Sequence, residues 1–198
     1  MIHPDTELRY IDDVVGYGVV ALKKIPKGTI VWVQDKFDQE FTPAEVEKME
    51  PIYKELIRKY TFRNHQGNHI LCWDFGRYVN HSFNSNCLTT GYEFEIAVRD
   101  IERGEELTDD YGYLNITANF EIKNANSERK TFYPDDLLRY HKLWDGILMK
   151  SIPTMIKVDQ PLETLINEEI WKEINDIIEG RREMRSILTN YYDPNFVS

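Results

Sequence analysis

Polar side chains crowd two stretches of this sequence where the neighbouring residues favour strands. The first, RYVNHSFNSNC, covers residues 77–87 and follows the apolar run HILCW. The second, LTDDYGYLN, covers residues 107–115 and follows the turn ERGEE. Amide, imidazole and phenol groups can hydrogen-bond a ligand and position reactants, and residues that break local rules often mark sites. The plainer alternative for the first stretch is a polar turn, because Asn and Ser hydrogen-bond to nearby backbone.

Composition limits the class of protein that could carry such a site. The chain has 198 residues, 41% hydrophobic and 13% aromatic, which suits one compact domain with or without a helical extension. No run reaches the roughly 20 apolar residues of a membrane helix, and the start MIHPDTELRY lacks the charged and apolar regions of a signal peptide. We therefore expect a soluble, intracellular, cytoplasmic protein without membrane contact, and a nuclear or host-targeted address stays open.

The charge balance is acidic. The chain has 34 Asp and Glu against 24 Lys and Arg, a formal net charge of −10. Such a surface repels a phosphate backbone, so direct binding of nucleic acid is not expected, whereas a basic partner would be attracted. Solubility alone also explains an acidic surface. The two cysteines, Cys72 and Cys87, form no CxxC pair, so neither a disulfide framework nor a cysteine-ligated metal site is expected.

Short strands dominate the first part of the predicted structure. Residues 19–22 (VVAL) and 29–33 (TIVWV) carry the β-branched and aromatic side chains typical of strands. HILCWDF at residues 69–75 has the same character, and YEFEIAVRDI at 92–101 alternates polar and apolar positions as a half-buried strand does. Residues 107–115 are expected to be extended as well, although their charges make a poor core strand.

Two short helices are predicted between these strands. Thr42 is a candidate N-cap, Pro43 suits the first helical position, and Glu45 completes a capping box. Pro51 interrupts the helix, because proline lacks the backbone donor that a helix interior needs. The second helix carries an apolar stripe that is expected to face the core: Ile52, Leu56 and Tyr60.

The character of the sequence changes after Asn119. Residues 121–130 (EIKNANSERK) are polar and predict a surface loop at a domain boundary. The pattern is helical from Tyr133 onwards, and an apolar stripe runs along one face of the last part. Such a stripe could cap the domain or pair two copies into a homodimer. Its members are Leu162, Leu165, Ile166, Ile170, Ile174, Ile177 and Ile178.

Three segments, taken in order and spacing, resemble the SET-domain protein lysine methyltransferases: GYG at residues 16–18, RYVNHSFNSNC at 77–87, and GEELTDDYGY at 104–113. The resemblance covers roughly residues 6 to 114. It implies a mainly β fold with α-helices, built of several small β-sheets with a knot-like threaded C-terminal segment. We accordingly expect a SET catalytic domain over 1–118, a helical insert over 38–68 that forms part of the substrate groove, and a helical C-terminal extension over 119–198.

The same resemblance implies a binding site for S-adenosylmethionine. Gly16, Tyr17 and Gly18 match the turn whose backbone approaches the methionine part of this cofactor, where side chains would obstruct. Asn80 and His81 match the pair that binds the cofactor, the Asn through its amide and the His largely through its backbone. A separate hypothesis, a nucleotide site built on GYG alone, lacks the strand, glycine loop and helix that such sites need.

Tyr111 matches the catalytic tyrosine of the family, with Asp110 as the preceding acid. Tyr113 resembles an aromatic residue that lines the lysine channel in some members, and Asp109 is expected beside the substrate. Asp109 also marks a departure, because many members have Phe or Tyr there, and Thr89 stands where other members supply a substitute aromatic. An acid near the amine would stabilise the ammonium. No metal is implied, since the cysteine-rich zinc segments of many members are missing.

The function implied is S-adenosylmethionine-dependent transfer of a methyl group to a lysine side chain. The acidic surface suggests a basic protein substrate, such as a histone tail or another Lys-rich segment. The alternative is a non-catalytic SET-like module that binds a peptide or a partner protein, which Asp109 and the missing zinc closure would favour. The sequence leaves the number of methyl groups open.

Overall fold

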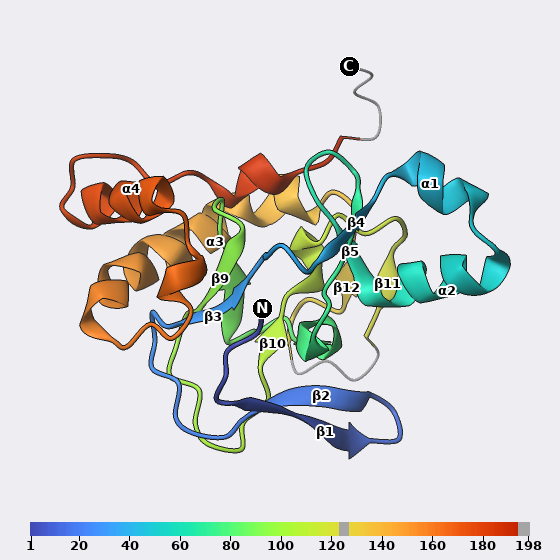
Figure 1. Cartoon of the computed structure of the whole chain (residues 1–198), viewed down its shortest axis with the longest axis horizontal. Helices are drawn as coiled ribbons and strands as arrows, with labels where there is room; N and C mark the ends of the chain where they lie inside the picture. Colours follow the sequence, from blue (N-terminus) through green and yellow to red (C-terminus); the bar gives the residue numbers. More distant parts are fainter. Residues whose placement is uncertain (123–126, 194–198) are drawn as a thin grey trace.

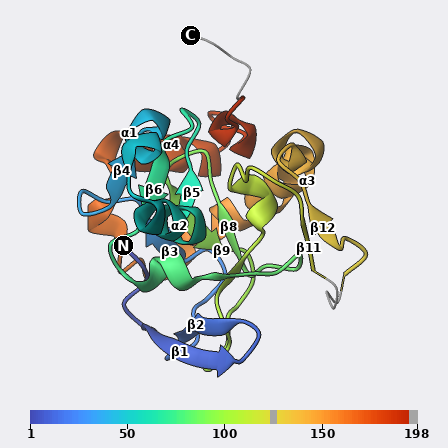
Figure 2. The same cartoon turned by 90° about the vertical axis from the view of Figure 1, so that its right-hand side faces the viewer.

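The computed structural model describes residues 1–122 and 127–193, and its strands form several small sheets rather than one large one. The sheets are mostly antiparallel pairs and triplets, as the mainly β expectation requires (Figures 1 and 2). The hairpin β1–β2 lies at the bottom edge in both views. The strands of the first half are β1 (Thr6–Asp12), β2 (Gly16–Ala21), β3 (Ile30–Val33), β4 (Gln39–Phe41), β5 (Thr61–Arg63), β6 (His69–Leu71), β7 (Asn80–His81), β8 (Cys87–Thr89) and β9 (Phe94–Ala97).

The three-stranded sheet β3–β9–β8 forms the middle of the molecule and is covered on both faces. Phe94 and Ile96 of β9 pack into the core cluster shared with the C-terminal helices. Ala97 and Trp32 belong to the cluster on the other side, with the N-terminal strands. All four residues of β9 are therefore buried, including Glu95. The prediction of a half-buried strand at residues 92–101 is wrong for residues 94–97.

The helical insert begins as the sequence predicted. The hydroxyl of Thr42 accepts a hydrogen bond from the Glu45 backbone N–H at 3.2 Å, and the Glu45 carboxylate accepts one from the Thr42 N–H at 2.7 Å. This capping box starts α1 (Pro43–Lys48), and Pro51 opens the separate helix α2 (Pro51–Tyr60). The expected inward stripe is wrong, however, because Ile52 is 65% exposed while Ile57 is buried.

The C-terminal helices share the core of the central sheet. Trp144 and Leu148 of α3 (Asp136–Ser151) and Ile174 of α4 (Glu168–Ile178) are buried in the same cluster as Phe94. In Figure 1, α3 and α4 lie on one side of β3 and β9 and the insert helices on the other. Most of the apolar stripe predicted from residue 162 onwards packs into this core, which leaves less of it for pairing two copies. The intervening 3-10 turns are η3 (Ile152–Lys157), η4 (Glu163–Leu165) and η5 (Ile187–Asn190).

The segment at 107–115 is extended only briefly, which corrects the expectation of a longer strand. Strand β10 spans Thr108–Asp109, and the 3-10 turn η2 (Tyr111–Tyr113) follows at once. The Asp110 carboxylate caps this turn by accepting a hydrogen bond from Gly112 N–H at 3.0 Å. A further turn, η1 (Phe75–Tyr78), precedes β7, and β11 (Phe120–Glu121) pairs with β12 (Thr131–Phe132) beside the loop expected at 121–130. Positions 123–126 of that predicted loop lie outside the described residues.

Two further observations bear on the expectations from composition. Cys72 and Cys87 are both buried and carry free thiols. In the ranges that the structure describes, no helix combines the length and the apolar character needed to cross a membrane.

Candidate active site

The glycine turn and Asn80 meet at the start of β2. The Asn80 side-chain amide donates hydrogen bonds to the Tyr17 carbonyl at 3.0 Å and to the Glu106 carboxylate at 2.6 Å. A Cβ atom at Gly18 would lie 2.2 Å from the Glu106 Oε1 and 2.9 Å from the Asn80 Nδ2. Gly16 has a φ of +81°, in the left-handed region that favours glycine. Position 18 therefore requires glycine because the Glu106 and Asn80 side chains lie too close for a Cβ atom. Position 16 favours glycine because its backbone has a positive φ.

A short parallel pairing brings the two polar stretches of the sequence together. Strands β7 and β10 pair in parallel, with Thr108 opposite Asn80 and Asp109 opposite His81. The Ser82 N–H donates to the Asp109 carbonyl at 2.8 Å, which extends the contact. The strand that ends in Asp109 leads directly into Tyr111, so the pairing fixes the place of the tyrosine relative to the asparagine and histidine. The pairing does not decide whether the late segment is threaded, and the knot-like crossing stays a prediction.

His81 lies in an aromatic environment that keeps its ring neutral. Its ring centroid is 5.3 Å from that of Tyr111 and 4.9 Å from that of Phe132. The Nδ1 atom accepts a hydrogen bond from the Tyr111 backbone N–H at 3.1 Å. Burial, and after it the Arg129 charge, lower the pKa of His81 to about 4. The Nε2 atom is buried and makes no hydrogen bond to any part of the chain that the structure describes.

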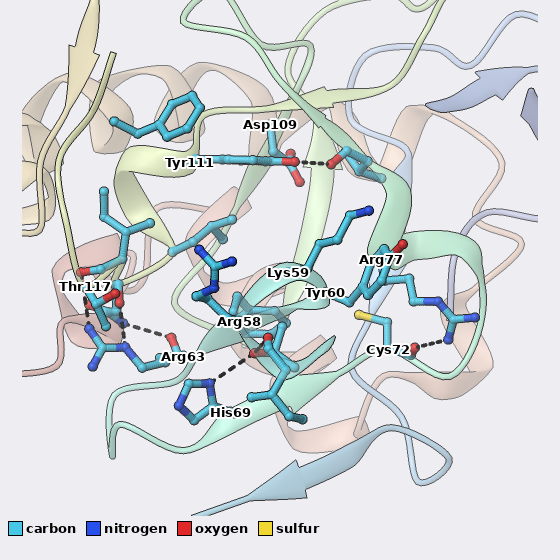
Figure 3. A pocket seen from close by; sticks show the side chains of 18 of the residues that line it. Arg58, Lys59, Tyr60, Arg63, His69, Cys72, Arg77, Asp109, Tyr111 and Thr117 are labelled. Carbon is cyan, nitrogen blue, oxygen red and sulfur yellow. Dashed lines mark hydrogen bonds between the residues drawn. The ribbon is translucent and has the colours of Figure 1, made fainter. Parts of the chain in front are cut away.

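Tyr111 lines a large cavity, and the backbone holds its hydroxyl in place. It donates a hydrogen bond to the Val79 carbonyl at 2.7 Å, drawn as the dashed line beside Tyr111 in Figure 3. Burial, followed by the charges of Asp109 and Glu106, raises the pKa of Tyr111. The phenol is thus neutral at physiological pH, which suits it to orienting another group rather than removing a proton.

The cavity has a volume of about 530 Å³ and combines apolar walls with two carboxyl groups. Asp109 and Glu95 both line it and are 6% and 9% exposed. Burial raises the pKa of Asp109 to about 6. Burial and the neighbouring Asp109 charge hold the pKa of Glu95 well above its ordinary value of 4.5. With a pKa of about 6 Asp109 is largely ionised at pH 7, while burial favours the neutral form of Glu95. The aromatic residues of the lining are Trp32, Tyr60, Phe62, Tyr111, Phe120 and Phe132.

Tyr113 contacts Asp109 through its hydroxyl, whereas its ring packs against α3. It is 2% exposed and packs edge-to-face on Trp144 with ring centroids 5.5 Å apart. It lines a second cavity of about 150 Å³, together with Thr89, and is not part of the lining of the larger one. The expectation that Tyr113 lines a lysine channel stays a prediction. Glu95 lines both cavities.

Asp110 has a structural role rather than contact with the cavity. Its carboxylate forms an ion pair with Arg129, whose other terminal nitrogen binds the Asp136 carboxylate at 2.6 Å. The Arg129 guanidinium also lies over the ring of Tyr140, 4.4 Å from its centroid. Arg129 thereby ties the residue before Tyr111 to the first turn of α3. This places the C-terminal helices in contact with the site.

Sequence reasoning missed Glu95, Glu106 and Arg129. Glu95 occupies an alternating pattern that predicts a solvent-facing side chain. Its burial becomes visible only in the structure, where a second core cluster packs on the other face of the sheet. Glu106 belongs to a charged turn, ERGEE, where a solvent-exposed role is the default. Arg129 stands in a polar loop with no helical or strand pattern of its own. Of these three residues, only Glu106 is next to a motif of the predicted site, because it directly precedes LTDDY. That position is the one sequence signal that could have indicated a role in the site.

Comparison with known proteins identifies the family. A family model of the SET domain matches residues 16–112, so this part of the chain is a SET domain. One solved structure that matches part of this chain is ctPRC2 in an autoinhibited conformation bound to S-adenosylmethionine, with 24% sequence identity and a TM-score of 0.44. The match covers 55% of this chain and 15% of that one, so this chain spans a small part of the other protein. No curated protein sequence matches the chain.

Proposed function

We propose that this protein transfers the methyl group of S-adenosylmethionine to the amine of a lysine side chain in a protein substrate. The observation that carries the proposal is the convergence of Asn80, His81 and Tyr111 through the β7–β10 pairing, beside a cavity with aromatic walls. Residues 16–112, which match the SET domain, include the glycine turn and all three of these side chains.

The residues present fit the cofactor. Gly16 and Gly18 have no side chains of their own, and Asn80 and Glu106 place an amide and a carboxylate beside Gly18. An ammonium and a carboxylate, as in the methionine part of the cofactor, would find partners there. The buried Nε2 atom of His81 and the ring of Phe132 border the space next to Tyr111. When bound, the cofactor supplies an electrophilic methyl group on a sulfonium.

The cavity residues prepare the lysine amine. The Asp109 carboxylate attracts the ammonium into the cavity, and the aromatic walls remove water from it. Loss of water lowers the pKa of a lysine ammonium from its ordinary value of about 10.4, whereas the Asp109 charge opposes this shift. The ammonium releases its proton to water, and the lone pair of the neutral amine then attacks the methyl group. The neutral Tyr111 hydroxyl, held by the Val79 carbonyl, can then hydrogen-bond the amine and orient it. Alignment of two reactants is the larger part of catalysis for an in-line displacement.

The test is methyl transfer from labelled S-adenosylmethionine to proteins of a cell extract and to lysine-containing peptides. We expect label in the wild-type reaction and a decrease of about hundredfold in Tyr111→Phe, because the amine loses its orienting partner. Tyr53→Phe is the matched control, since this ring is 54% exposed on α2 and should leave the rate unchanged. Cofactor binding without transfer to any substrate would instead favour a non-catalytic peptide-binding module.

A further inference from the structure

The mouth of the 530 Å³ cavity is cationic although the chain as a whole is acidic. The carboxyl side chains among the described lining residues are Glu95 and Asp109, and both are buried. The whole chain carries 34 acidic and 24 basic side chains, so the local balance runs opposite to the average. Figure 3 shows several of these cations around the space that Asp109 and Tyr111 border. We call them the cationic rim: Lys54, Arg58, Lys59, Arg63 and Arg77.

Two arginines of the cationic rim are held by neutral groups, which leave their charge uncancelled. Arg63 donates to the carbonyl of Asn115 at 2.6 Å and to that of Ile116 at 3.2 Å. Arg77 donates to the carbonyl of Cys72 at 3.2 Å. Carbonyl oxygens fix the direction of a guanidinium without neutralising it. Both arginines therefore contribute a positive field at fixed positions.

Two other members of the rim are available to a ligand. Arg58 and Lys59 are exposed, and neither forms an ion pair with a carboxylate within residues 1–122 or 127–193. The Lys59 ammonium lies over the ring of Tyr60, 4.9 Å from its centroid. Lys54 does have a partner, Glu47, at 3.5 Å. The free cations thus sit together at the end of α2, where the insert meets the cavity.

Local rather than overall charge decides which segment can lie here. At physiological salt, charges farther apart than about 8 Å are largely screened, so the distant acidic surface contributes little at the rim. A Lys- or Arg-rich segment would place like charges against Arg58 and Lys59, which is unfavourable. A segment with carboxylates beside its target lysine would pair them with the rim, while the lysine itself would extend towards Asp109.

We propose that the substrate lysine is carried by an acidic segment, whose Asp or Glu side chains bind Arg58 and Lys59 at the mouth of the cavity. The proposal rests on the proposed methyl transfer for its use of the cavity, and it replaces the basic substrate expected from net charge alone. The substrate therefore has a lysine whose ammonium approaches Asp109 inside the cavity. The acidic residues beside that lysine contact the cationic rim.

Binding of fluorescent peptides tests the rim without requiring methyl transfer. The peptides have one length and one central lysine, with flanks of Asp and Glu, of Asn and Gln, or of Arg. We expect the acidic peptide to bind the full-length protein about fivefold more tightly than the neutral one in fluorescence anisotropy, and the advantage to disappear in high salt. Equal binding of the three peptides, or tighter binding of the Arg-flanked one, overturns the proposal.

A pair of charge-matched variants locates the effect. Arg58→Gln combined with Lys59→Gln should abolish the preference for the acidic peptide. Arg103→Gln combined with Lys172→Gln removes the same charge at exposed positions outside the cavity lining and should retain it. Preference that survives the first double variant contradicts the assignment to the rim. Circular dichroism checks that both double variants are folded.

Labelled cofactor added to the same peptides separates the two proposals. If the labelled methyl group is transferred mainly to the acidic peptide, the result supports both the proposed enzyme activity and the acidic substrate segment. An anisotropy preference without transfer to any peptide leaves the rim assignment in place and rejects the proposed enzyme activity. Transfer chiefly to the Arg-flanked peptide supports the enzyme activity and rejects the acidic segment.

Discussion

Glu95 and Asp109 bring two carboxyl groups together in the interior, one from the central sheet and one from the segment that leads to Tyr111. Both line the cavity, and each lies within range of the other's charge. Burial and the neighbouring charge make it costly for both carboxyl groups to ionise, so each charge favours the neutral form of the other group. The negative charge of Asp109 suits the cavity to an ammonium group.

This pair makes part of the stability depend on pH. The pKa of Asp109 is raised from 3.8 to about 6 in the folded protein, so its contribution to stability is complete below pH 3.8 and is lost as pH rises to about 6. We expect Asp109→Asn to be less sensitive to pH than wild type over this range by about 3 kcal/mol. Urea denaturation at a series of pH values measures the difference.

The exposed Glu128→Gln serves as control for the change of one acidic residue to its amide. It should follow the wild-type pH dependence. If Asp109→Asn did so too, Asp109 would not be the group that titrates over this pH range.

His81 should act with the opposite sign. Burial and Arg129 lower its pKa from 6.5 to about 4. Between these two pH values the histidine is therefore protonated in the unfolded chain and neutral in the folded protein. Stability contributed by the neutral ring is lost as pH falls from 6.5 to about 4. Because the ring is only partly buried, we expect a loss of about 2 kcal/mol, absent in His81→Gln. Denaturation curves of the two proteins that stay parallel through this range would argue against a neutral, buried His81.

Gly18→Ala should separate binding from folding. The new Cβ would meet the Glu106 carboxylate and the Asn80 amide, so we expect affinity for S-adenosylmethionine to fall by about tenfold or more. The stability should change by less than about 1 kcal/mol, because the end of the Glu106 side chain can move. Calorimetry and thermal unfolding measure the two effects.

Gly146→Ala is the matched control for this substitution. Gly146 lies inside α3 with nothing within 4 Å of an added Cβ. We expect it to stabilise the protein by up to about 1 kcal/mol, because alanine is the better helix former, and to leave cofactor affinity unchanged. Equal losses of affinity in both variants would show that the Gly18 effect is not local.

Arg129 should be among the most sensitive positions for stability. Its carboxylate partners Asp110 and Asp136 are 2% and 0% exposed, so removal of the cation leaves two buried carboxylates unpaired. We expect Arg129→Met to cost about 3 to 5 kcal/mol in urea denaturation.

The comparison is Arg139→Gln, which breaks an ion pair with Asp135 whose side chains are 48% and 44% exposed. This pair should contribute at most about 0.5 kcal/mol. Similar losses in the two variants would mean that Arg129 does not hold α3 against the site.

The sequence predicted the features that depend on neighbouring residues. The capping box of Thr42 and Glu45 and the break at Pro51 are local interactions, and both are confirmed. The SET domain itself was recognisable because short motifs carry its glycine turn, its Asn–His pair and its tyrosine in a fixed order. The prediction that the apolar stripe of α2 faces the core was wrong, because the periodicity of a short helix does not indicate which side faces the core.

What the sequence alone determined about this protein is its family, its small strands and the residue types that its site would use. Only the tertiary structure decided that Glu95 is buried beside Asp109, that the ring of Tyr113 packs on Trp144, and that cations surround the mouth of the cavity. The physical reason is that burial and local charge depend on which distant segments cover a strand or meet at an edge. Those segments are brought together by packing of the whole chain, and a local pattern of residues does not encode their positions.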